Sequence, residues 1–114
     1  TKNGKSTEKI FDVVWSDDRK KDATGKLPAV GNTVDVKTAT YTNNIGAAEL
    51  IGYWEDTEFD PQSYVTYYAR VIEIPTPRWS TYLAAKHNMD VNKSVDATIQ
   101  ERAWTSPVWY VPVK

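Results

Sequence analysis

Hydrophobic and polar side chains alternate most regularly over residues 63–74, in the stretch SYVTYYARVIEI. The two faces of an extended chain would carry different side chains here: Val65, Tyr67, Ala69 and Val71 on one, and Tyr64, Thr66, Tyr68, Arg70 and Ile72 on the other. A period of two among aromatic and β-branched residues predicts a β-strand. Pro75 and Pro77 follow directly. Because proline has no backbone N–H to donate, they predict that this strand ends at Ile74.

Four further stretches have the apolar and β-branched composition of strands. They cover residues 8–16, 33–41, 47–55 and 101–113, and loops rich in Gly, Pro, Asn and charged residues separate them. Pro107 lies inside the last stretch. Since it removes one ladder donor, the last strand needs an edge position or a bulge at that residue.

One helix is predicted, over residues 79–88, with Ser80 as its N-cap and Asn88 closing it. It belongs to an insertion, residues 75–100, between the last two predicted strands. A connection of this length is unusual for a hairpin and is often functional or interfacial.

This order of elements predicts an all-β fold, an antiparallel immunoglobulin-like β-sandwich with one short helix in the insertion. Tyr67 would then be the corner tyrosine that bonds back to the preceding acidic turn, residues 55–61. The last strand would pair with residues 67–74.

Residues 1–114 are too few for more than one domain. Five predicted strands fall short of the seven in such a sandwich, so we expect a fragment of one, incomplete at its N-terminus. The hairpin-turn dipeptide Asn3-Gly4 has only two residues before it, which indicates a missing partner strand. A flexible N-terminal tail is the alternative. A fragment with an open edge is expected to associate, as a homo-oligomer or by strand exchange.

Composition excludes several classes of function. The net charge of −1, with acidic and basic residues interspersed, supplies no basic field for nucleic acid. No apolar run approaches the roughly 20 residues of a membrane span. There is no cysteine for a disulfide, a thiolate metal site or a Cys nucleophile.

Few residues could carry chemistry, and none is predicted to be catalytic. Asp56, Glu58 and Asp60 alternate like the start of a calcium loop, but the glycine and the distal glutamate of that motif are missing. An acidic corner is therefore the favoured interpretation. His87 is the only histidine, so no multi-histidine metal site can form within this chain.

The segment TPRWSTY, residues 76–82, is the main candidate for contact with a substrate or with another domain. It places Arg78 and Trp79 between two prolines and a helix start, with Tyr82 one turn further along. Arg102, at the start of an aromatic-rich strand, is a second candidate. The fork of donors on an arginine suits an anionic group.

Several long strings match a known family in order. They are EKIFDVVWSDDRK, LPAVGNTVDV, YTNNIGAAEL, FDP, YYARVIEIPTPRWSTY and ATIQERAWTSPVWY. Over about residues 8–110 the chain resembles the C-terminal end of the bacterial family called "domain of unknown function 3604". The resemblance implies a longer parent protein related to the PHP metal-dependent phosphoesterases, whose metal motifs lie outside these residues. It also suggests a periplasmic or secreted location, which the residues themselves leave unknown.

The resemblance implies a non-catalytic β-sandwich portion of an exported metal-dependent hydrolase. It would pack on the catalytic domain of its own protein and contribute the loop with Arg78 to the rim of the active site, with no cofactor of its own. A stand-alone carbohydrate- or protein-binding module, using Trp79, Trp104 and Trp109 as a platform, is the alternative. A calcium-stabilised adhesive domain is a third.

Overall fold

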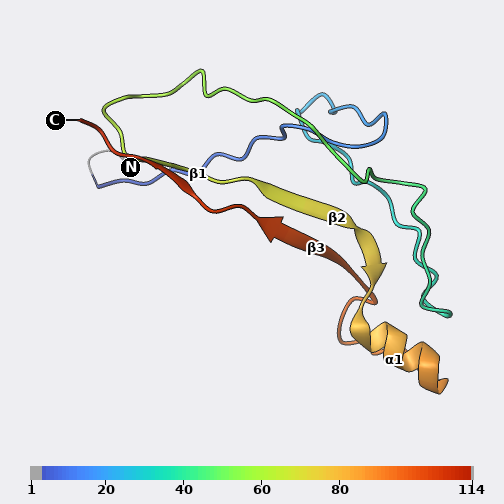
Figure 1. Ribbon diagram of the computed structural model, residues 1–114. Helices are drawn as coiled ribbons and strands as arrows, with labels where there is room; N and C mark the ends of the chain where they lie inside the picture. Colours follow the sequence, from blue (N-terminus) through green and yellow to red (C-terminus); the bar gives the residue numbers. More distant parts are fainter. Residues whose placement is uncertain (1–3, 114) are drawn as a thin grey trace.

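A computed structural model describes residues 4–113 and contains four strands and one helix. The elements are β1 (Val65–Tyr67), β2 (Arg70–Pro77), α1 (Trp79–His87), β3 (Thr98–Trp104) and β4 (Val108–Tyr110). They form two small antiparallel sheets, β1 with β4 and β2 with β3 (Figure 1). The chain is therefore β-rich with one short helix, as the sequence predicted.

The predicted strands over 63–74 and 101–113 pair with each other, as expected, but each is interrupted. Tyr67 lies opposite Val108, and Arg70 lies opposite Trp104. Between these two pairs, the chain that joins β3 to β4 has one residue more than the chain that joins β1 to β2. At that point Thr105 donates its N–H to the Ala69 carbonyl and accepts the Ala69 N–H on Oγ1, both at 3.0 Å. The prediction of a bulge or edge position at Pro107 is thus confirmed, and the interruption divides the ribbon into two sheets.

The prediction that Pro75 and Pro77 end the strand is wrong, because β2 continues through both. Arg78 donates its N–H to the Ala97 carbonyl at 2.9 Å. Since N–H groups alternate in direction along a strand, positions 75 and 77 face away from β3, where no donor is needed. A register shift between Ile72 and Pro75 precedes them, and there the side-chain amide of Gln100 donates to the Glu73 carbonyl at 2.9 Å.

The three earlier predicted strands are not regular strands in this structure. Within 33–41, Asp35 and Thr40 bond to each other across a tight turn, and Asp35 Oδ1 also accepts the Lys37 N–H at 2.9 Å. A short carboxylate that bonds the backbone two residues on favours a turn over an extended ladder. Sequence periodicity alone does not reveal this competition.

Residues 8–16 and 47–55 lie side by side. They contact each other through side chains and not through a ladder of backbone hydrogen bonds. The rings of Phe11 and Trp54 approach to 4.7 Å between centroids. A Cβ at Gly52 would lie 2.9 Å from the Val14 Cβ, so the glycine permits this close approach. Neither segment is assigned to a strand in the described structure.

The helix differs from its prediction at one end. Its N-cap is Arg78, with no side-chain capping bond, and Ser80 lies within the first turn. At the other end Asn88 adopts the left-handed conformation, φ 51°, and its N–H bonds back to the last turn, as predicted. Met89 donates to the Ala84 carbonyl at 2.9 Å.

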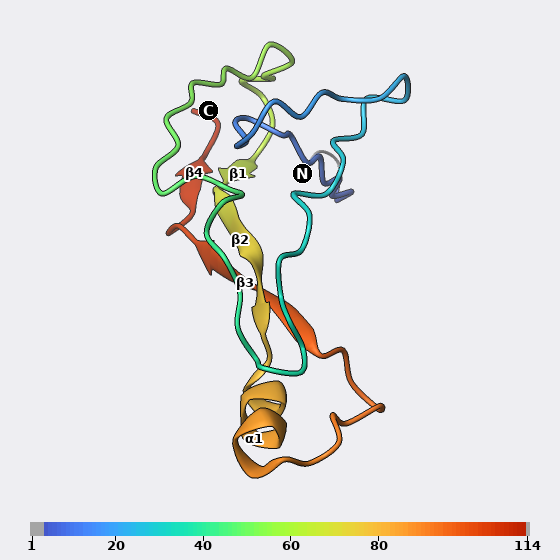
Figure 2. The same ribbon diagram turned by 90° about the vertical axis from the view of Figure 1, so that its right-hand side faces the viewer.

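The molecule is elongated and has little interior. Its extents are 64 × 31 × 26 Å and its radius of gyration is 19.2 Å, whereas a compact domain of similar length has roughly 13 Å. Among residues 4–113 the buried hydrophobic residues other than proline are two alanines, Ala39 and Ala84. The four strands together form a two-stranded ribbon that runs along the molecule (Figure 2). In this ribbon β1 and β4 lie at the end opposite to α1.

Candidate functional site

Arg78 lies at the junction of β2 and α1, where several hydrogen bonds converge. Its Nε donates to the Asp96 carbonyl at 2.8 Å, and its own carbonyl accepts the Thr81 N–H at 2.9 Å. Thr81 Oγ1 in turn donates to the Ala97 carbonyl at 2.7 Å. The first turn of α1 is therefore tied to the segment that leads into β3.

This junction is also the best packed part of the described chain. Pro75, Pro77, Thr81 and Ala84 are all buried, and Thr81 has no exposed surface. Two prolines fix φ just before Arg78, and a helix follows it at once. This burial and these prolines support the sequence prediction of a rigid loop, which stays a prediction.

An open groove of about 530 Å³ runs along β3 beside this junction and contains both predicted arginines. Its lining residues are Pro75, Arg78, Asp96, Thr98, Ile99, Gln100, Glu101, Arg102 and Trp104. A second depression of about 370 Å³ continues from it, shares Arg78 and Asp96, and adds Lys93. The structure thus brings Arg78 and Arg102 to one surface, although the sequence had placed them on separate elements.

The donors of this groove have capacity left for a ligand. Only the Nε of Arg78 is engaged, and its two terminal nitrogens have no partner among residues 4–113. The side chain of Arg102 makes no hydrogen bond or ion pair within the same range and is exposed. Asp96 and Glu101 lie at the same surface, so the groove carries charges of both signs.

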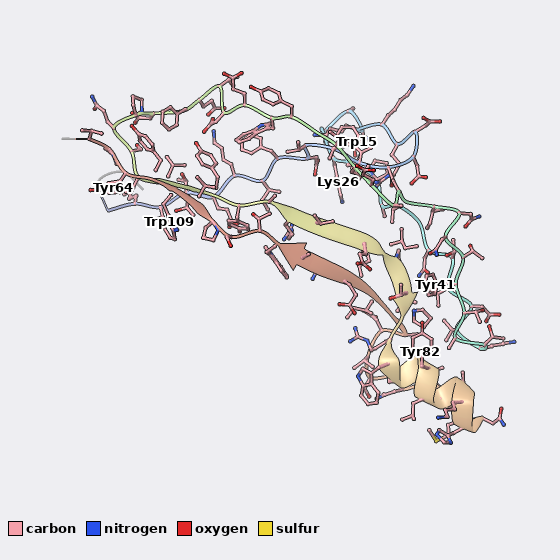
Figure 3. The ribbon with its side chains drawn as sticks, viewed as in Figure 1. Trp15, Lys26, Tyr41, Tyr64, Tyr82 and Trp109 are labelled. Atoms are coloured by element: carbon pink, nitrogen blue, oxygen red, sulfur yellow. The ribbon has the colours of Figure 1, made fainter. Side chains whose placement is uncertain are left out.

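The other two predicted contact residues do not line this groove. Trp79 and Tyr82 belong to α1 and are 73% and 45% exposed, but neither lines it. Figure 3 shows Tyr82 at the start of the helix, whereas Trp109 lies near the other end of the ribbon. Trp79, Trp104 and Trp109 occupy α1, β3 and β4, and no ring contact joins any two of them within residues 4–113.

Sequence reasoning missed Gln100, Asp96 and Lys93 as members of this surface. The period of two in TIQERAW could have indicated Gln100, because this residue shares a strand face with Arg102 and Trp104. Asp96 and Lys93 come from an irregular loop, whose path no periodicity specifies.

Tyr67 donates its hydroxyl to Asp56 Oδ2 at 2.6 Å, a residue of the acidic turn that the sequence singled out. This bond to a carboxylate, with burial and the negative charge adding to it, raises the pKa of Tyr67 to about 12. The Tyr67 ring also meets Trp54 edge-on, 6.0 Å between centroids. The role of Tyr67 as a corner of an immunoglobulin-like sandwich stays a prediction.

Two acidic residues of that turn have partners within the described chain. Glu58 pairs with Lys9, and Asp60 Oδ2 accepts from Ser63 Oγ at 2.9 Å. No group of three or more metal-ligating side chains comes together in residues 4–113. His87 is exposed in the last turn of α1. Over the same part of the chain, no helix has the length and apolar character needed to cross a membrane.

Comparison with known proteins gives one match. No curated protein and no solved structure matches the chain. A family model described as "Protein of unknown function (DUF3604)" matches residues 1–112, nearly the whole sequence. The chain therefore belongs to the DUF3604 family.

Proposed function

We propose that this chain is the non-catalytic, C-terminal β-rich part of a metal-dependent hydrolase and packs on the catalytic domain of its own protein. The observation that carries the proposal is the large apolar surface left exposed by a chain with almost no core. Val108, Trp109 and Val111 on the ribbon are 66%, 70% and 60% exposed. Single exposed apolar residues are normal, but exposure throughout an elongated chain marks an interaction surface.

The arrangement of the elements supports the same proposal. Two narrow sheets bury little on their own, since an isolated two-stranded ribbon is marginally stable at best. In this proposal, the rest of the protein supplies the second layer of an immunoglobulin-like sandwich. The relation to PHP-type phosphoesterases, and a periplasmic or secreted location, rest on the sequence resemblance and form part of this proposal.

Hydrogen–deuterium exchange tests the packing directly. We expect β3, β4 and α1 to exchange slowly in the full-length protein and much faster in residues 1–114 produced alone. The turn at residues 22–26, which is exposed in the structure, serves as the internal control and should exchange alike in both. Equal protection of β3 and β4 in the two proteins would exclude the proposal.

The rim contribution concerns Arg78, whose terminal nitrogens are available to an anionic group. In the full-length enzyme, Arg78→Ala should raise KM for an anionic substrate about tenfold, the usual worth of one charge-assisted hydrogen bond. Lys86→Ala removes the same charge from the exposed last turn of α1 and is the matched control. Unchanged kcat and KM in a folded Arg78→Ala enzyme would remove Arg78 from the rim.

A stand-alone protein-binding module is the second candidate, favoured by the exposure of Trp109 on β4. The two candidates differ in where this ring lies in the whole protein. A packing domain buries Trp109 against the catalytic domain, whereas a binding module leaves it in solvent. Quenching of the Trp109 fluorescence by iodide, judged against a Trp109→Phe variant of the full-length protein, distinguishes them.

A further inference from the structure

The groove along β3 combines side chains that the packing role does not use. Arg102 and Trp104 lie on the same face of β3, and Gln100 precedes them on that face. Arg78 closes one end of the groove. We propose that this groove binds an acidic saccharide, with a sugar ring against Trp104 and its carboxylate or sulfate group on Arg102.

The cations form a track that suits several acid groups in succession. Arg102 lies four residues from Thr98, roughly 13 Å along an extended strand, and Arg78 lies beyond Thr98 at the helix junction. Lys93 extends the same track through the adjoining depression. A chain of acidic sugars repeats its charge at intervals, so it can meet these cations one after another.

Trp104 explains why a sugar fits better than a bare anion. Trp104 is 58% exposed, and its backbone position lies about 7 Å from that of Arg102, two residues along one face of the strand. The negative face of an indole attracts the C–H groups on the flat side of a pyranose. The Oε1 of Gln100, whose amide nitrogen already bonds the Glu73 carbonyl, remains available to accept a sugar hydroxyl.

The charge balance of the groove argues against nucleic acid, the commonest other polyanion. Asp96 and Glu101 lie beside the cations, and the whole chain has a net charge of −1. Nucleic acid gains its affinity from a broad basic field that neutralises many phosphates, and this surface has none. A saccharide offers hydroxyl donors to Asp96 and Glu101 as well as acid groups to the arginines.

The rigid junction reduces the cost of binding. The Nε–Asp96 bond and the buried prolines fix the direction of Arg78 before a ligand arrives. A donor that is already oriented loses less side-chain entropy when it binds. Arg102 has no such support, so its contribution depends on charge and on the fork of its donors.

The inference rests on the proposed function, because it places the groove at the rim of the same hydrolase. The test therefore measures binding, which requires no catalysis. The full-length protein is titrated with polygalacturonate, with dextran sulfate and with neutral dextran, following tryptophan fluorescence and calorimetry. Both acidic polymers should bind, and more weakly as salt is added, whereas neutral dextran should not. The polymer that binds more tightly shows whether the site prefers a carboxylate or a sulfate group.

Three variants connect the binding to the groove. Arg102→Ala removes no side-chain hydrogen bond or ion pair of the described chain and should weaken binding about tenfold, and Trp104→Leu should weaken it similarly. Arg102→Lys keeps the charge and should retain part of the affinity. Lys86→Ala, outside the groove, should bind like the unaltered protein. Thermal melting confirms that each variant is folded.

The outcomes separate the two proposals. Equal affinity for neutral and acidic dextrans, or equal losses from Arg102→Ala and Lys86→Ala, would overturn the saccharide site. Protected ribbon strands in hydrogen exchange without saccharide binding would leave the packing role standing and remove only this inference.

Discussion

At the scale of single residues, the hydroxyl of Tyr67 makes a polar contact between segments outside the helix junction. It joins β1 to the acidic turn by donating to Asp56, at 2.6 Å. The same ring continues an aromatic row through Trp54 to Phe11. One side chain therefore connects three segments that share no backbone ladder with each other in the described structure.

The Tyr67 bond predicts a pH dependence of stability. An ordinary tyrosine loses its proton near pH 10, whereas the pKa of Tyr67 is raised to about 12 by its bond to Asp56. Between these values the unfolded chain loses the proton that the folded chain keeps, so rising pH favours unfolding. The contribution should be complete below pH 10 and lost as pH rises through about 12.

Tyr67→Phe tests this expectation. It should lower the free energy of unfolding by about 1 kcal/mol at neutral pH, and the difference from the unaltered protein should vanish in strong alkali. Tyr41→Phe is the control, because the Tyr41 hydroxyl makes no hydrogen bond within residues 4–113. Urea unfolding at several pH values measures the free energy of unfolding of both variants and of the unaltered protein. If the loss caused by Tyr67→Phe were the same at every pH, the raised pKa of Tyr67 would be contradicted.

Residue by residue, the sequence identified Arg78 and Arg102 as candidates but not their common groove. Their chemistry is visible in the residue type, whereas their proximity depends on the register of β2 with β3 and on the path of residues 88–97. The N-cap was wrong for a similar reason. Ser80 is the preferred capping residue by type, yet the helix already begins at Trp79, because the preceding prolines and the Arg78 bonds fix its start.

At the scale of elements, α1 is attached to the sheet chiefly through Thr81. This side chain has no exposed surface and donates to the Ala97 carbonyl at 2.7 Å. Ser80, its neighbour, has a buried hydroxyl oxygen without a hydrogen-bond partner in the described structure. Two adjacent hydroxyls in one helical turn thus have opposite energetic roles.

Substitutions at these two positions should change stability in opposite directions. Thr81→Val keeps the shape but removes one of the two donors to the Ala97 carbonyl, which still accepts the Arg78 N–H, so it should cost about 1 kcal/mol. Ser80→Ala removes an unsatisfied hydroxyl and should be neutral or slightly stabilising. Chemical denaturation of the two variants checks this. A larger loss for Ser80→Ala than for Thr81→Val would show that α1 is attached in another way.

Periodicity predicted the elements unevenly, and the reason is physical. The stretches 63–74 and 101–113 are rich in β-branched and aromatic residues, and they pair with each other, so local preference and tertiary pairing agree. Residues 33–41 contain an Asp that bonds its own turn, and residues 8–16 find side-chain contacts without a ladder. A strand needs a partner, and the pattern of one segment does not show whether its partner is present.

At the scale of the whole molecule, the elongated shape and the exposed apolar side chains have one common cause. A chain of this length gains its stability from buried apolar area, yet hardly any hydrophobic side chain is fully buried within residues 4–113. Area that the chain does not bury by itself is available to a partner. Under the proposed function, that partner is the catalytic domain of the same protein.

This surface predicts that residues 1–114, produced alone, associate in solution. Free strand edges beside exposed apolar residues favour edge-to-edge pairing between copies. Light scattering after size exclusion should give a mass that rises with concentration, and a dye for apolar surfaces should bind. Trp109→Gln and Val108→Thr remove apolar area from β4 and should shift the population towards monomer, whereas Lys86→Ala, on α1, should not. A monodisperse monomer with a steep unfolding transition would mean that the chain stabilises itself without the contact that the proposed function requires.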